Sequence, residues 1–70
     1  MKKYQHWSLE ALKSKRQSLF EDIEEWNSIL ARTKSVLIQF SLTHYIKNAK
    51  EEIRAIDAEL CYREHENKTV

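Results

Sequence analysis

Residues 8–30 read SLEALKSKRQSLFEDIEEWNSIL, and their apolar side chains recur at steps of three and four. This spacing places apolar side chains on one face of an α-helix and is typical of a coiled-coil seam. The seam consists of Leu9, Leu12, Leu19, Ile23, Trp26 and Leu30. Ser8 stands where an N-cap is expected, Glu10 brings negative charge into the first turn, and Arg16 interrupts the seam. The stretch predicts a helix over about 8–32.

Residues 42–60 read LTHYIKNAKEEIRAIDAEL and carry a second apolar series with the same spacing. Its members are Leu42, Ile46, Ala49, Ile53, Ile56 and Leu60. The two series are out of register, so one straight helix cannot hold both on a single face. We therefore expect a turn at about 32–36, a second helix over about 36–64, and a frayed polar tail over 65–70.

Folding the chain back on itself aligns the two series. In an antiparallel hairpin, residues at equal height have numbers with a constant sum. The expected pairs are Leu9 with Leu60, Leu12 with Ile56, Leu19 with Ala49, Ile23 with Ile46, and Trp26 with Leu42. The charges agree: the acidic block at 21–25 falls opposite His44, Lys47 and Lys50, and a basic block at 13–16 falls near Glu52 and Asp57. The chain is thus predicted to be a single all-α domain over 1–70, an antiparallel two-helix hairpin.

The turn leaves alternatives open because residues 36–40 (VLIQF) are mostly apolar. In one alternative, the first helix extends to about Phe40 and Ser41 caps the second helix. A β-strand over 36–40 is a further alternative on propensity alone.

Composition narrows the class of protein. The chain has no Gly and no Pro, which disfavours folds with many tight turns. With 41% hydrophobic and 33% charged residues, it is too apolar for a disordered chain and too polar for a membrane span. The net charge of +1 gives no global attraction to nucleic acid or membranes.

The basic N-terminus is not followed by an apolar run, so no signal peptide is expected. One cysteine forms no internal disulfide, so a reducing cytoplasm is the expected location. A protein exported by a route without a cleaved signal would have the same sequence features.

Seventy residues joined along one seam bury little apolar surface, so stability is expected to depend on a partner. Several apolar residues near the turn are not used by the seam. The predicted partner-binding residues are Ile29, Val36, Leu37, Phe40 and Tyr45. Two hairpins packed face to face would form a homodimeric four-helix bundle. A helix from another protein, laid in a groove, is the competing interpretation.

Two further patterns suggest chemistry. His6, Cys61 and His65 approach one another at the open end of the predicted hairpin, and Cys and His are zinc ligands. The competing interpretation is two histidines at frayed ends and a small buried thiol, so we predict neither a metal nor a cofactor. Lys13, Lys15 and Arg16, with aromatic residues nearby, suggest a nucleic-acid surface instead. No catalytic constellation or phosphate-binding loop is present in the sequence, so an enzyme is not expected.

In length and seam pattern, residues 8–64 resemble two groups of small bacterial proteins. One is the plasmid-copy-number regulator Rop, a hairpin that dimerises into a four-helix bundle and binds paired RNA loops. The other is the two-helix cochaperones of type III secretion, which pair with a partner chaperone to shield the needle subunit. From the apolar surface near the turn, we expect a protein-interaction module acting as a small regulator, adaptor or chaperone subunit, in a small bacterial or phage protein. The resemblance includes no shared motif that assigns roles to particular residues.

Overall fold

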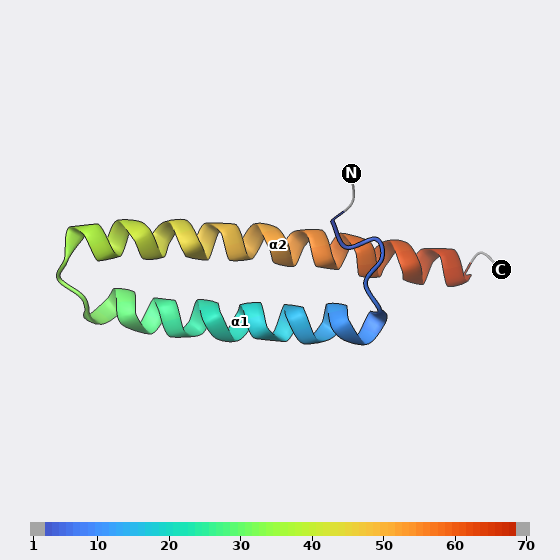
Figure 1. Ribbon diagram of the computed structural model, residues 1–70, viewed down its shortest axis with the longest axis horizontal. Helices are drawn as coiled ribbons and strands as arrows, with labels where there is room; N and C mark the ends of the chain where they lie inside the picture. Colours follow the sequence, from blue (N-terminus) through green and yellow to red (C-terminus); the bar gives the residue numbers. More distant parts are fainter. Residues whose placement is uncertain (1–2, 69–70) are drawn as a thin grey trace.

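Two long helices form an antiparallel hairpin in the computed structural model (Figure 1). It describes residues 3–68, except for the side chains of the last two. Helix α1 spans Leu9–Arg32, and helix α2 spans Val36–Lys68. The all-α hairpin is confirmed, and no strand occurs in the described residues, so the alternative of a strand over 36–40 is wrong.

The start of α1 is capped by its own sequence. Ser8 has an extended backbone, and its hydroxyl accepts a hydrogen bond from the amide of Ala11 at 3.1 Å. The amide of Leu12 donates to the carbonyl of Ser8 at 3.0 Å. These two bonds occupy amides that the first helical turn would otherwise leave without partners.

The connection between the helices consists of residues 33–35. The amide of Thr33 donates to the carbonyl of Ile29 at 2.9 Å and closes α1. Ser35 then caps the start of α2. Its carbonyl oxygen accepts a hydrogen bond from the amide of Gln39 at 3.0 Å, and its hydroxyl oxygen accepts one from the amide of Ile38 at 3.4 Å. The alternative of a first helix extending to Phe40 is therefore wrong. No described residue has a positive φ, which is how the chain makes this connection without glycine.

The seam between the helices carries the core. Buried apolar side chains recur along both helices at nearly the positions that the apolar series predicts. They are Leu12, Leu19, Leu42, Ile46, Ala49, Ile53 and Ile56, with Ile23, Trp26 and Leu60 partly buried beside them. Leu9 departs from the prediction, because its side chain is 49% exposed. Tyr4, which precedes the helix, is buried in the core at that end of the seam.

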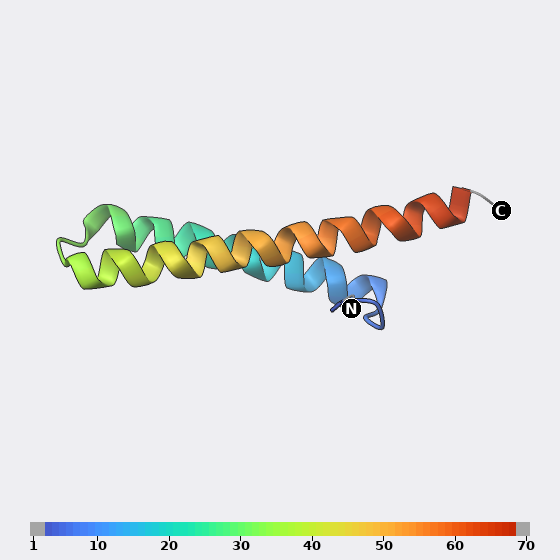
Figure 2. The same ribbon diagram turned by 90° about the horizontal axis from the view of Figure 1, so that it is seen from above.

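The two helices cross at a shallow angle and diverge sideways towards the open end (Figure 2). Helix α2 is the longer and extends past the start of α1 (Figure 1). It continues to Lys68, four residues beyond the expected boundary at 64, and residues 69–70 lie outside the described part. The Tyr62 hydroxyl donates to Glu66 at 3.3 Å within this last stretch. Neither helix, over the described residues, is long and apolar enough to cross a membrane.

Candidate functional site

The open end of the hairpin is covered by residues 3–7, which we call the N-terminal clasp. The clasp lies alongside α2 where the two helices diverge (Figures 1 and 2). Tyr4 is only 2% exposed, and its ring meets the ring of Trp7 edge-on, with centroids 5.0 Å apart. The amide of Trp7 donates to the carbonyl of Tyr4 at 3.2 Å, which folds the clasp into a turn. The chain thus buries an aromatic side chain ahead of its first helix.

Glu52 on α2 holds one side of the clasp. Its Oε1 accepts hydrogen bonds from Lys3 Nζ at 2.7 Å and from the Tyr4 hydroxyl at 2.8 Å. These two bonds lower the pKa of Glu52, because they favour its ionised form. The hydrogen bond to Glu52 raises the pKa of Lys3, and burial, with the carboxylate beside it, raises the pKa of Tyr4.

Arg63 holds the other side of the clasp. Its Nε donates to Glu59 Oε2 at 2.7 Å, and Glu59 is only 8% exposed. One of its amino nitrogens lies within hydrogen-bonding distance of the carbonyl oxygens of Tyr4, Gln5 and Trp7. The guanidinium therefore compensates a buried carboxylate and satisfies backbone carbonyls at once. Neither contact was predicted.

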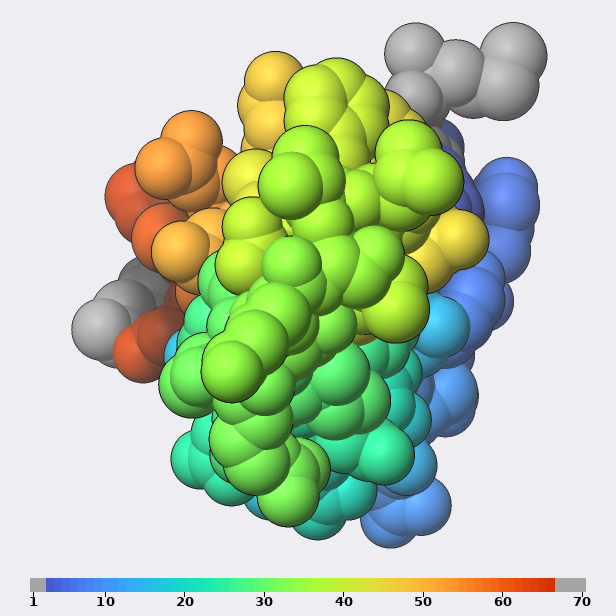
Figure 3. Space-filling model, turned by 90° about the vertical axis from the view of Figure 1, so that its left-hand side faces the viewer, coloured from blue at the N-terminus to red at the C-terminus, as the bar shows by residue number. Residues whose placement is uncertain are grey.

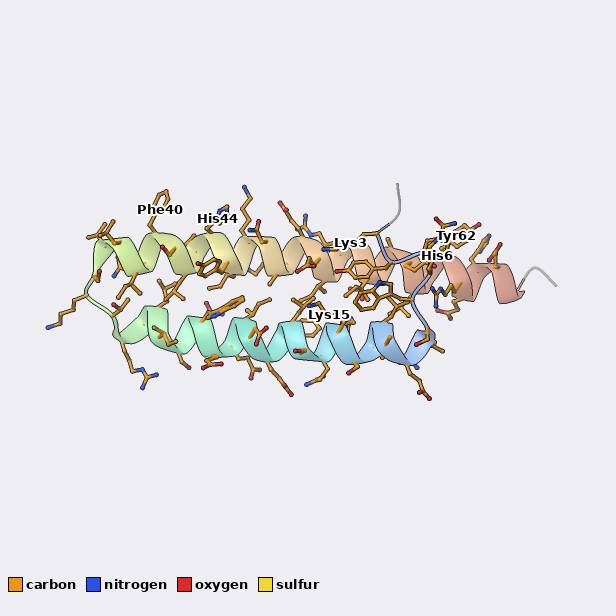
Figure 4. The ribbon with its side chains drawn as sticks, viewed as in Figure 1. Lys3, His6, Lys15, Phe40, His44 and Tyr62 are labelled. Carbon is orange, nitrogen blue, oxygen red and sulfur yellow. The ribbon has the colours of Figure 1, made fainter. Side chains whose placement is uncertain are left out.

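The turn end has no comparable cover. Val36, Leu37 and Phe40 are 75%, 81% and 79% exposed, and we call these three residues the outer turn patch. Phe40 projects from α2 on the side away from α1, as does His44 one turn later (Figure 4). Seen end-on, this stretch of α2 forms the upper half of the turn end (Figure 3). A shallow, mainly apolar hollow continues the patch along α2 and is lined by Val36, Gln39, Phe40, Thr43, His44 and Lys47.

The other two predicted partner-binding residues do not join this patch. Ile29 on α1 is half-buried. The ring of Tyr45 packs against that of Trp26, with centroids 5.8 Å apart, so Tyr45 lies on the flank of the hairpin rather than on its outer side. Ile38, which the prediction left out, is 47% exposed. The five predicted residues are thus divided between the outer side of α2 and the sides of the hairpin.

The predicted nucleic-acid residues lie on different sides of α1. Arg16 Nε donates to Asp57 Oδ1 at 2.6 Å, and its guanidinium covers the ring of Phe20 at 4.7 Å. Lys15 is half-buried on the side facing α2, whereas Lys13, two positions away on the helix, is exposed. The three residues therefore do not form one basic surface.

The predicted charge pairing is only partly realised. Asp57 does meet the basic block through Arg16. Glu52 binds Lys3, and the charge of Lys15 from the basic block also helps to lower the pKa of Glu52. The acidic block at 21–25 makes no ion pair with His44, Lys47 or Lys50 among the described side chains. These groups are exposed in large part, and such pairs are weak in water.

The candidate metal ligands are not brought together. Nowhere in the described part of the chain do three His, Cys, Asp or Glu side chains form a group that could hold a metal ion, so His6, Cys61 and His65 do not make the suggested site. Cys61 is an exposed free thiol on α2, and His6 is an exposed residue of the clasp. No protein-family model, curated protein or solved structure matches the chain. Geometry and charge alone therefore carry the functional interpretation.

Proposed function

We propose that this chain is a non-enzymatic protein-interaction module, acting as a small regulator, adaptor or chaperone subunit, that binds its partner through the outer turn patch. The observation that carries the proposal is the exposure of Val36, Leu37 and Phe40, each at least 75% accessible, side by side at one end of α2. Contiguous exposed apolar patches mark interaction sites in soluble proteins.

The form of the patch suggests a helical partner. Val36 and Phe40 are one turn apart and Leu37 lies beside them, so they form a ridge along α2. Ridges of this kind pack into grooves between the side chains of another helix. Both a second copy of the hairpin and an amphipathic helix from another protein, as in a type III cochaperone, fit this description. The Rop-like alternative has less support, because Arg16 is already paired with Asp57.

The test compares Phe40→Asp with Leu9→Asp, which places the same charge at an exposed apolar position at the other end of the molecule. We expect Phe40→Asp to reduce the mass in solution or to abolish capture of a partner by the immobilised protein. Leu9→Asp should preserve both. Helicity measured by circular dichroism should stay the same in both variants, since neither side chain is in the core. Unchanged mass and unchanged capture for Phe40→Asp would overturn the proposal.

A further inference from the structure

The outer side of α2 carries a second seven-residue repeat, on the face opposite the seam with α1. Its positions are again three and four apart, and all of them are exposed. They are Leu37, Phe40, His44, Lys47, Glu51, Arg54, Ala58 and Cys61. The two ends of this outer repeat are apolar or small, whereas its middle is charged. A helix partner of uniform apolar character would leave the charged middle without compensation.

An antiparallel copy of the same helix compensates it. About a two-fold axis near residue 49, Lys47 faces the partner's Glu51, and each such pair occurs twice. Phe40 faces the partner's Ala58, so a large ring meets a small side chain, and Leu37 faces the partner's Cys61. His44, whose Nε2 lies 3.3 Å from Asn48 Nδ2 on its own helix, faces the partner's Arg54. A parallel arrangement would instead set Phe40 on Phe40 and Lys47 on Lys47.

We propose that the partner bound by the outer turn patch is a second copy of this chain, with the two α2 helices packed antiparallel along the outer repeat. This inference rests on the proposed function and specifies its partner. From Leu37 to Cys61 the contact runs roughly 36 Å along the helix, at about 1.5 Å per residue. The clasp leaves this face accessible, since it is held from Glu52 and Arg63, and Glu51, Ala58 and Cys61 of the outer repeat are exposed. The apolar patch at the turn of one copy then covers the end of α2 in the other.

Charge exchange tests the register. Lys47→Glu sets like charges against the partner's Glu51 in both pairs, and Glu51→Lys does the same with positive charge. Each variant alone should dimerise roughly tenfold more weakly. An equimolar mixture should regain the wild-type dimer, because every cross-pair is then of opposite charge. Like-charge contacts within one helix do not change on mixing, so recovery reports the contact between copies. The controls are Lys13→Glu and Glu24→Lys, exposed positions on α1 that should neither weaken nor rescue the dimer.

A cross-link tests the same geometry independently. Leu37→Cys sets a thiol opposite the partner's Cys61, so a short bis-maleimide should give a covalent dimer at low protein concentration. The wild-type chain should not cross-link, because its two Cys61 residues lie at opposite ends of the contact. Ser14→Cys, exposed on α1 and therefore off the outer repeat, is the matched control.

The outcomes separate the two proposals. A dimer that depends on Phe40 but shows neither rescue on mixing nor the Leu37→Cys cross-link overturns the antiparallel arrangement and leaves the interaction surface standing. A monomer at every concentration that captures another protein through Phe40 overturns the second copy as the partner. If Phe40→Asp changes neither mass nor capture, both proposals fail.

Discussion

The two ends of the hairpin treat apolar surface in opposite ways. At the open end, the clasp lays Tyr4 over the core until its side chain is 2% exposed, and Glu52 and Arg63 fasten it there. At the turn end, Phe40 is left 79% exposed. Burying a side chain of this size contributes about 1.5–3 kcal/mol. The chain obtains this contribution at one end and forgoes it at the other, as expected if the turn end gains its cover from a partner.

The largest expected effect removes the seam on which both ends depend. Leu12 is fully buried between the helices. Leu12→Ala leaves a cavity there and should reduce the free energy of unfolding by about 2–5 kcal/mol. Urea unfolding followed by circular dichroism measures this loss. Leu9→Ala, at a half-exposed position, should cost far less. Equal losses for the two variants would mean that the seam is not packed as described.

The next experiment contrasts the two ends directly. Tyr4→Ala should reduce the free energy of unfolding by about 1–3 kcal/mol, because a buried aromatic side chain is lost while the hairpin itself can remain folded. This loss should be the same at every protein concentration. Phe40→Ala should cost less than about 0.5 kcal/mol in the monomer. A cost that appears only as concentration rises would assign Phe40 to an interface. Tyr4→Phe keeps the ring and isolates the hydrogen bond to Glu52.

A smaller effect is expected from the Arg63 side of the clasp. Arg63→Met keeps much of the apolar stem but leaves Glu59 buried without its partner. We expect a loss of about 1 kcal/mol or somewhat more in thermal or urea unfolding. Lys50→Met, at an exposed position on the same helix, is the matched control and should be nearly neutral. A neutral Arg63→Met would show that Glu59 is compensated in another way.

The smallest effect is a dependence of the clasp on pH. The bonds from Lys3 and Tyr4 hold the pKa of Glu52 below its unfolded value of about 4.5. The stabilisation is therefore fully present above about pH 4.5 and is lost as the pH falls through the lower, folded pKa. Fluorescence of Trp7, measured in a Trp26→Phe background, should report release of the clasp on acidification. Glu52→Gln should remove this change in fluorescence. A change of the same size in that variant would mean that another group causes the release of the clasp.

Much of the hairpin could be predicted because helical periodicity is local. The apolar steps placed α1 within one residue of its observed start and α2 at its observed first residue, Val36. The end of α2 was missed because no Gly or Pro marks it. The clasp was missed for a different reason. Lys3 and Glu52 are 49 positions apart, and no repeat relates a residue outside a helix to its partner on one.

The partner surface was predicted only in outline. Counting apolar residues beyond the seam correctly indicated that some near the turn would remain exposed. It did not indicate which of them share a side. Tyr45 lies on the flank because it packs on Trp26, and Ile29 is half-buried. Both outcomes follow from how the two helices cross. The spacing of apolar residues within one helix gives no information about this crossing.

The distribution of contacts along the hairpin also sets an order of folding. Contacts near residues 33–35 join parts of the chain that are close in sequence, while those of the clasp join residues 48 to 59 positions apart. Loop closure becomes more costly with separation, so the hairpin is expected to zip from its turn, with the clasp closing last. The end that exposes Phe40 is thus native in shape while the other end is still open. A second chain can meet the outer turn patch, the apolar part of the docking surface, on a molecule that has not yet completed its own fold.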